Sequence, residues 1–242
     1  MRTTRIYYAA ELAVNSTVVL DKTASHHLIR VLRMTAGAEI TVFNNSAYEY
    51  DCVLLDENPK AASIHVNAMT ACHRESPLRI HLLQGVSRGD RMDLTIQKAT
   101  EIGIDKITPA LCNRTNISLD AERKQKKFDH WQQIIISASE QSGRSQLVKL
   151  DNVCTLETAL QETKPALKLV LDPAANASLR TLDKAEEIVL LIGPEGGLTE
   201  TEIELAQKHG FTGVSLGPRI LRTETASIAC IAALQALWGD LG

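Results

Sequence analysis

The sequence predicts an α/β protein with two domains, a small N-terminal β-barrel at residues 1–72 and a larger parallel-sheet domain at residues 73–242. Two observations indicate this fold class. Short strand-like runs separated by turn residues fill the first part of the chain, whereas from residue 78 onward apolar strand-like runs alternate with helix-like segments. The polar stretch 71–77 ends in proline and separates the two patterns, as a linker would.

Composition and charge argue against several classes of protein. The net charge is −3, so the chain lacks the overall basic field of many nucleic-acid-binding proteins. The five cysteines are scattered and form no C-x-x-C pair, which favours reduced thiols over disulfides or a zinc site. No apolar run approaches the ~20 residues that span a bilayer, and the N-terminus lacks the apolar core of a signal peptide. We therefore expect a soluble cytoplasmic protein that uses neither a metal nor a membrane.

The first domain is expected to contain one helix among short strands. The helix should begin with Ser25 as its N-cap and continue through residues 26–33. Arg30 and Arg33 would then share one face of it. Arginine suits phosphate oxygens, so these two side chains are candidates for phosphate contact; a solvated face is the alternative. The strands are expected at residues 18–20, 39–43, 48–55 and 63–66.

The second domain is expected to be a parallel sheet covered by helices on both faces. Asp90 should cap the first helix, with Gly103 as its C′ residue, and Thr199 with Glu202 forms a capping box for a later helix. The last helix is apolar nearly all round, so it should be buried in the core or in a subunit interface. Strands are expected at residues 78–83, 104–110, 167–171, 188–192 and 213–216, and helices at 90–102, 121–142, 199–209 and 225–238.

The stretch 189–226 is the expected binding site. Two of its strands each end in a glycine-bearing turn, at residues 193–197 and 217–218. Open α/β sheets bind ligands at the carboxyl ends of adjacent parallel strands, and glycine lets main-chain groups approach a ligand closely. A single turn of this kind would be explained more simply as a tight connection between a strand and a helix. Two turns followed by the polar cluster 222–225 favour a site.

These turns match neither of the common nucleotide-binding loops. The spacing GPEGG differs from G-x-G-x-x-G, and no Gly-Lys-Ser/Thr follows the first glycine. The carboxylate of Glu195 is also a poor neighbour for phosphate. The ligand is therefore expected to be uncharged at this loop and to be held by main-chain hydrogen bonds.

Two motifs in this stretch carry a resemblance to a known family. LLIGPEGGLTETEI at 190–203 and LGPRILRTETA at 216–226 are similar to motifs of the bacterial 16S ribosomal RNA uridine-N3 methyltransferases of the SPOUT class, which modify U1498. The likeness runs along nearly the whole chain. Further similar segments are HHLIRVLRM, ESPLRIHL, IQKATEIGI, EQSGR and ALWGDLG.

The resemblance implies a fold and a reaction that composition and spacing do not show. The small domain would be a PUA-like RNA-binding β-barrel, and the larger one a SPOUT methyltransferase domain with a C-terminal trefoil knot. The knot would bind S-adenosylmethionine, and the chain would act as a homodimer. The reaction would be methylation of N3 of U1498 in the 16S ribosomal RNA of the small subunit.

Site residues also follow from the resemblance. Arg222 and Glu224 lie where the methyl acceptor should enter, and Arg114, Glu140 and Arg144 would face the same cleft. The expected S-adenosylmethionine contacts are Leu171, Pro173, Leu191, Ile192, Gly193, Glu195, Gly196, Leu216, Gly217, Leu221 and Thr223. The expected RNA contacts are Arg2, Arg5, Arg30, Arg33, Arg123 and Lys124.

The expected reaction needs a group that deals with the proton on uracil N3. N3 is a poor nucleophile until that proton is lost, so the site must stabilise the anion or remove the proton. We expect Arg222, or else Arg114 or Arg144, to hold the uracil carbonyls. Glu224 is a weaker candidate for the base, because a carboxylate there could equally complement the dipole of the last helix.

Three other functions stay open on sequence alone. A SPOUT methyltransferase could act on tRNA, on another rRNA position or on a ribose 2′-hydroxyl, and analysis of the methylated nucleosides would distinguish these. A catalytically silent RNA-binding module would not bind S-adenosylmethionine. A nucleotide-dependent metabolic enzyme would bind ATP or NAD instead.

Overall fold

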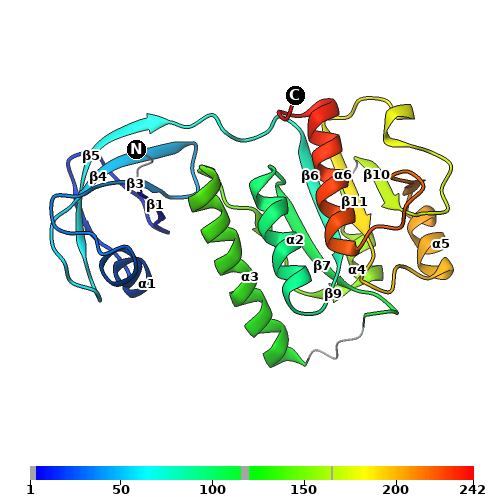
Figure 1. The fold of residues 1–242 in the computed structure, drawn as a ribbon, viewed down its shortest axis with the longest axis horizontal. Helices are drawn as coiled ribbons and strands as arrows, with labels where there is room; N and C mark the ends of the chain where they lie inside the picture. The colour runs from blue at the N-terminus through cyan, green and yellow to red at the C-terminus, as the bar shows by residue number, and fades with distance from the viewer. Residues whose placement is uncertain (1–3, 116–119, 165) are drawn as a thin grey trace. The chain divides into compact units, whose positions relative to one another are not determined.

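The chain was analysed as a computed structural model, which describes residues 4–115, 120–164 and 166–242. The fold divides into two compact units (Figure 1). The first unit extends to Glu75 and also includes Ser139–Leu147, and the second consists of Ser76–Ala138 and Val148–Gly242. The predicted mixed α/β class is confirmed, since the first unit is mainly strands and the second alternates strands with helices.

The first unit is built on a five-stranded sheet with the order β1-β3-β4-β5-β2. Strands β1 and β3 are parallel, and the other neighbours are antiparallel. Inward-facing residues alternate along β4, where Tyr50, Cys52 and Leu54 are buried. The first strand has no counterpart among the sequence predictions. The strands are β1 (Thr4–Tyr7), β2 (Thr17–Val19), β3 (Glu39–Phe43), β4 (Tyr48–Leu54) and β5 (Ser63–Ala71).

The helix of the first unit begins earlier than predicted. Asp21 is its N-cap, because the Asp21 side chain accepts hydrogen bonds from the main-chain N–H groups of Thr23 and Ala24. The α-helical part, α1 (Lys22–His26), continues directly into the π-helical turn η1 (His27–Val31). Ser25 is therefore wrongly predicted as the cap.

The hydroxyl of Ser25 connects the helix to the sheet instead. Ser25 is fully buried, and its Oγ accepts a hydrogen bond of 2.9 Å from the main-chain N–H of Ala62. The predicted pairing of Arg30 and Arg33 on one helix face is also wrong. Arg33 lies beyond the end of η1 with a φ of 56°, a left-handed conformation that leaves the helical path.

The second unit contains a sheet of seven strands, all paired in parallel. The main path has the order β12-β10-β11-β6-β7-β8, and β9 also pairs with β7. Near-continuous apolar runs such as EIVLLI in β11 are typical of strands buried on both faces. The strands are β6 (Arg79–Gly85), β7 (Lys106–Leu111), β8 (Lys149–Leu150), β9 (Cys154–Thr155), β10 (Leu167–Leu171), β11 (Glu187–Ile192) and β12 (Thr212–Val214).

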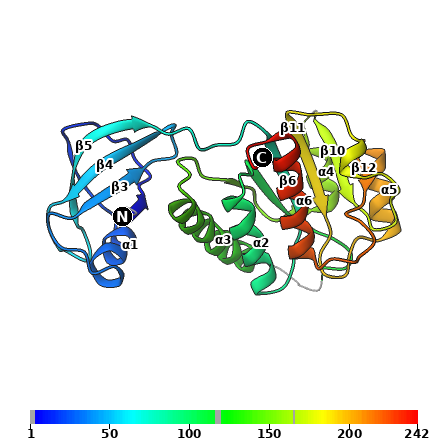
Figure 2. The same ribbon diagram turned by 45° about the horizontal axis from the view of Figure 1, so that its top comes forward.

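Helices cover both faces of this sheet, as predicted (Figure 2). One core cluster packs α4 and α5 against Leu83, Val189 and Leu191, which point to the same face of their strands. On the other face α2 packs against α6. No helix of the described residues is long and apolar enough to span a membrane. The helices are α2 (Asp90–Glu101), α3 (Ala121–Ser142), α4 (Leu156–Gln161), α5 (Glu200–Lys208) and α6 (Thr223–Trp238), with a 3-10 turn η2 (Leu179–Thr181).

Most helix ends follow the predicted signals. Thr199 and Glu202 form the expected capping box at the start of α5. Gly103 and Gly210 follow α2 and α5 with φ values of 86° and 85°, the left-handed conformation expected of C′ glycines. The start of α2 differs, because Gly89 is its N-cap and the predicted cap Asp90 lies in the first turn.

The second unit also holds a half-buried histidine. His81 lies on β6, and its Nε2 is 2.8 Å from Thr108 Oγ1, which donates to Asp151 Oδ2 at 2.6 Å. Burial, together with Lys106 and Lys149, lowers the pKa of His81 from 6.5 to about 4, against an opposing effect of Asp151. The folded chain thus binds this proton more weakly than the unfolded chain does.

His81 should therefore make stability depend on pH. Its contribution is complete above pH 6.5 and is lost as the pH falls through the window from 6.5 to about 4. In the His81→Gln variant, the free energy of unfolding should therefore decrease less steeply as the pH falls through that window. Urea unfolding at several pH values measures this. The same pH dependence of the unfolding free energy in the wild type and the variant would contradict it.

Candidate functional site

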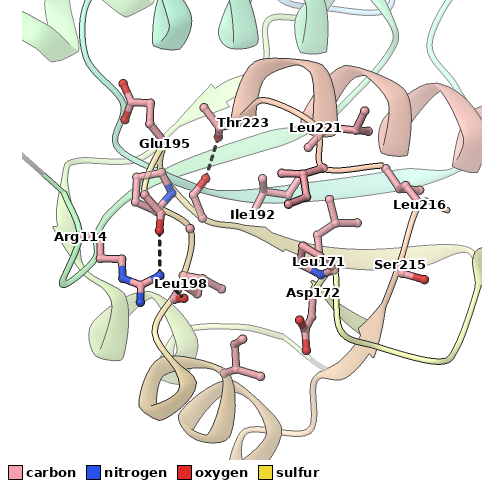
Figure 3. A pocket seen from close by; sticks show the side chains of 18 of the residues that line it. Arg114, Leu171, Asp172, Ile192, Glu195, Leu198, Ser215, Leu216, Leu221 and Thr223 are labelled. Atoms are coloured by element: carbon pink, nitrogen blue, oxygen red, sulfur yellow. Dashed lines mark hydrogen bonds between the residues drawn. The ribbon is translucent and has the colours of Figure 1, made fainter. Parts of the chain in front are cut away.

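A cavity of about 400 Å³ lies at the carboxyl ends of three strands of the second unit (Figure 3). Its walls come from the segments that follow β10, β11 and β12. The two strands that end in the glycine-bearing turns, β11 and β12, are not adjacent as expected, because β10 lies between them in the sheet, but both turns line the cavity. The end of β10, with Leu171, Asp172 and Pro173, therefore adds a third wall to the cavity.

The loop after β11 has no room for a side chain at positions 193 and 196. A Cβ atom on Gly193 would lie 2.9 Å from the main-chain nitrogen of Leu198, and one on Gly196 would lie 2.9 Å from Arg114 Cβ. Gly197 has a φ of 70°, and its N–H donates to the carbonyl of Pro194 at 2.9 Å. The glycines thus permit a tight loop whose main chain faces the cavity.

Arg114 supports this loop from the end of β7. Its Nη1 donates to the carbonyl oxygens of Gly196 at 2.9 Å and Leu198 at 3.3 Å. Arg114, which was expected to contact uracil, is therefore hydrogen-bonded to the loop in this structure. Figure 3 shows Arg114 on one side of the cavity, with the apolar side chains of Leu171, Leu216 and Leu221 on the other.

Glu195 is held by the residues at the start of α2. Its Oε1 accepts from the main-chain N–H of Arg88 at 2.8 Å and from Arg91 Nη1 at 3.0 Å. Burial raises the pKa of this carboxyl, but the hydrogen bonds and the Arg91 charge outweigh that effect and lower it overall. Glu195 is therefore ionised and paired within the protein, although it also lines the cavity.

The start of α6 presents the two residues that were expected to face the methyl acceptor. Arg222 is the exposed N-cap residue, and within the described residues its guanidinium makes no hydrogen bond or ion pair. Glu224 is 9% exposed, and its buried Oε2 finds no hydrogen-bond partner among the described residues. A buried carboxylate oxygen without a donor is unusual in folded proteins. Neither residue is among those that line the cavity.

Most of the predicted cofactor contacts gather at the cavity. Leu191 is the exception: it is fully buried in the core beneath α4 and α5. The described residues also contain no group of three or more His, Cys, Asp or Glu side chains that could hold a metal ion. The predicted contacts that line the cavity are Leu171, Pro173, Ile192, Gly193, Glu195, Gly196, Leu216, Gly217, Leu221 and Thr223.

Arg144, one of the predicted active-site arginines, lies in the first unit and does not line the cavity. It forms a two-pronged ion pair with Glu75, through Nε at 2.9 Å and Nη2 at 2.6 Å. The guanidinium is nearly buried in this ion pair, and the expected contact with uracil stays a prediction. Glu140 is also used within the unit, where it accepts from the main-chain N–H of Tyr7 at 3.0 Å, and burial raises its pKa.

The predicted RNA contacts divide into buried and exposed groups. Arg5 is ion-paired with Glu49 and donates to the carbonyl of Arg144 at 2.9 Å, and its side chain is only 9% exposed. The expected phosphate contact of Arg5 is therefore wrong. Arg30, Arg33 and Arg123 are exposed, Lys124 is half-buried, and Arg2 lies outside the described residues.

Sequence reasoning missed two residues near the cavity. Asp172 lines it directly, and Gln84 is fully buried at the end of β6, 3.0 Å from Thr223 Oγ1. The signal for Gln84 was a lone amide at the end of an apolar strand, directly before Gly85. A polar residue in such a run needs a buried partner.

Comparisons with known proteins decide the family. Residues 74–235 match the family model described as an RNA methyltransferase domain, and residues 20–67 match an RNA methyltransferase PUA domain. The chain belongs to the RNA methyltransferase family. The family predicted from the two C-terminal motifs is thus confirmed, and the PUA match places an RNA methyltransferase PUA domain in the N-terminal unit.

Full-length relatives carry a consistent name. The ribosomal RNA small subunit methyltransferase E of Buchnera aphidicola subsp. Schizaphis graminum is 37% identical over 99% of this chain and 98% of its own length. The protein of that name from Bacillus subtilis is 33% identical over 87% of this chain and 86% of its own length.

Two solved structures are similar over the full length of both chains. A Legionella pneumophila protein in complex with the cofactor SAM has a TM-score of 0.97 at 40% identity. The ribosomal RNA small subunit methyltransferase E of Neisseria gonorrhoeae, bound to S-adenosyl methionine, has a TM-score of 0.93 at 36% identity.

Proposed function

We propose that this chain methylates N3 of U1498 in the 16S ribosomal RNA of the small subunit, with S-adenosylmethionine as the methyl donor. The observation that carries the proposal is the cavity at the ends of β10, β11 and β12, which is bordered by a main-chain loop. It lies in a chain whose full-length structural neighbours are described with this cofactor bound.

The residues of the cavity fit S-adenosylmethionine. A volume of about 400 Å³ falls within the roughly 300–1,000 Å³ of pockets for small ligands. Leu171, Leu216 and Leu221 offer an apolar surface for a purine ring, and the loop 193–198 offers main-chain groups for hydrogen bonds. Asp172 adds a carboxylate that suits a cationic ligand. When bound, the cofactor supplies a methyl group on a positively charged sulfur.

The groups on the first turn of α6 suit the uracil. Arg222 is exposed and has no partner among the described residues, so its guanidinium can meet the uracil carbonyls and stabilise negative charge. Glu224 has a buried carboxylate oxygen that lacks a donor within the described residues, and the N–H of N3 would supply one. We assign Arg222 to anion stabilisation and Glu224 to removal of the N3 proton.

We further propose that the PUA-like domain at residues 1–72 binds RNA, with Arg30 and Arg33 as phosphate contacts. Both side chains are exposed. Arg123 and Lys124 at the start of α3, in the second unit, are proposed as further phosphate contacts. The domain at residues 73–242 is proposed to be a SPOUT domain whose C-terminal segment forms a trefoil knot, in a homodimer that works in the cytoplasm.

Nucleoside mapping tests the proposed reaction. In a strain that lacks this gene, 16S ribosomal RNA should lose N3-methyluridine at U1498, and expression of this chain should restore it. Nuclease digestion followed by mass spectrometry measures both. A methyl group restored on tRNA, on a ribose or at another rRNA position would contradict the proposed substrate.

Arg222→Ala should lower kcat by about 100-fold, since loss of one donor to a developing anion typically costs this much. S-adenosylmethionine affinity and stability should stay unchanged, because the guanidinium has no protein partner among the described residues. Single-turnover kinetics and calorimetry measure these effects. Arg180→Ala is the matched control, an exposed arginine of the same unit outside the cavity lining.

The same kinetic assay tests Glu224. Glu224→Gln should reduce kcat by at least about 100-fold if the carboxylate removes the proton. Near-normal turnover of Arg222→Ala or of Glu224→Gln would remove that residue from the mechanism.

The phosphate contacts predict a salt effect. The double variant Arg30→Ala/Arg33→Ala should bind 16S RNA more weakly at low salt, and the dependence of log Kd on log salt should become shallower by about 1.5, since each phosphate contact contributes roughly 0.7–0.9. Filter binding at several salt concentrations measures this slope. A slope equal to that of the wild type would contradict the assignment.

A further inference from the structure

A buried hydrogen-bond network joins the ends of β6 and β11 to the start of α6. Gln84 and Ser227 are fully buried, and Thr223 is nearly so. Gln84 Nε2 lies 3.0 Å from Thr223 Oγ1, 3.1 Å from the carbonyl oxygen of Gly85 and 3.5 Å from that of Gly193. At the other end of the amide, Ser227 Oγ donates to Gln84 Oε1 at 2.7 Å.

The chemistry of these neighbours fixes the direction of each bond. Two carbonyl oxygens and a hydroxyl surround one end of the Gln84 side chain, so that end must be the donating NH₂ group. Thr223 Oγ1 donates its own hydrogen to the carbonyl of Gly193 at 2.7 Å. It can therefore only accept from Gln84. The carbonyl of Gly193 receives donors from both side chains.

This network connects the two parts of the proposed active site. Gly193 begins the loop that borders the cavity, and Thr223 lines the cavity from the first turn of α6. Arg222 and Glu224 flank Thr223 in the same turn. A displacement of the Gln84 amide would thus move the loop 193–198 and the turn that carries Arg222 and Glu224 with respect to each other.

We propose that Gln84 is a positioning residue of this methyltransferase. Its amide holds the Gly193 carbonyl and the Thr223 hydroxyl together, so that the loop 193–198 keeps the main-chain geometry that S-adenosylmethionine requires. This inference rests on the proposed function. It concerns a side chain that does not itself line the cavity.

The chain offers a matched control for a purely structural role. Gln235 is also fully buried in the second unit. Its Nε2 donates to the carbonyl of Gly103 at 2.8 Å, and its Oε1 accepts from Ser76 Oγ at 2.7 Å. Gln235 therefore repeats the chemistry of Gln84, an amide between a glycine carbonyl and a serine hydroxyl, without touching the loop 193–198.

The test compares Gln84→Glu with Gln235→Glu. Each replacement keeps the size of the side chain and removes its N–H donors. Both variants should have a lower melting temperature, because each removes buried hydrogen bonds: those of Gln84 to Thr223 Oγ1 and the Gly85 carbonyl, and that of Gln235 to the Gly103 carbonyl. Only Gln84→Glu should weaken S-adenosylmethionine binding, by about tenfold or more in Kd by calorimetry. Its KM for the cofactor should rise in parallel, with a smaller change in kcat at saturating cofactor.

Gln84→Met and Gln235→Met repeat the comparison without a buried charge, should either glutamate variant fail to fold. Unchanged cofactor affinity in the folded Gln84 variants would overturn the positioning role. Equal weakening by the Gln235 variants would overturn it as well, because the effect would then follow from lost stability. A wild-type chain that does not bind S-adenosylmethionine would overturn the proposed function, and this inference with it.

Discussion

The site depends on close main-chain packing around the loop 193–198. Three glycines permit it, and each fills a place where a side chain would collide with other atoms. A Cβ on Gly85 would lie 2.5 Å from the nitrogen of Pro194, and Cβ atoms on Gly193 and Gly196 would each lie 2.9 Å from a neighbouring atom. The end of β6 can therefore lie directly against the loop after β11. The carbonyl groups of the loop then come within reach of the side chains that hold them.

Side chains from separate elements secure this loop at separate points. Thr223 and Gln84 hold the carbonyl of Gly193 from within the unit, and Arg114 holds those of Gly196 and Leu198 from the end of β7. Arg91 neutralises Glu195 at the start of α2. Such a loop presents fixed hydrogen-bonding groups to a ligand, which reduces the ordering cost of binding. The arrangement thus explains how a glycine-rich turn that matches neither common nucleotide-binding loop can serve as a specific site.

Much of the second unit could be predicted because its signals are local. The bounds of α3 and β10, and the capping box of Thr199 and Glu202, follow from periodicity and cap residues within a few positions. The order of the strands could not be predicted in this way. Strand β10 enters between β11 and β12, and such pairing depends on contacts between distant parts of the chain.

Two ion pairs could not be predicted for the same reason, because their partners lie far apart in the sequence. Arg5 and Glu49 are 44 positions apart, and Arg144 and Glu75 are 69 positions apart. No residue close to either arginine in the sequence indicated that its side chain would be buried in an ion pair. Arg5 was therefore assigned to RNA, whereas Arg144 was assigned to the uracil site through the resemblance to the family. The π-helical turn after α1 and the left-handed conformation of Arg33 likewise could not be predicted from the periodicity of apolar residues.

A crystal structure of this chain with S-adenosylhomocysteine, the demethylated cofactor, would show whether the cavity binds the methyl donor. We expect the ligand to occupy the cavity at the ends of β10, β11 and β12, with hydrogen bonds to the main chain of the loop 193–198. A ligand bound elsewhere, with no contact to that loop, would contradict it.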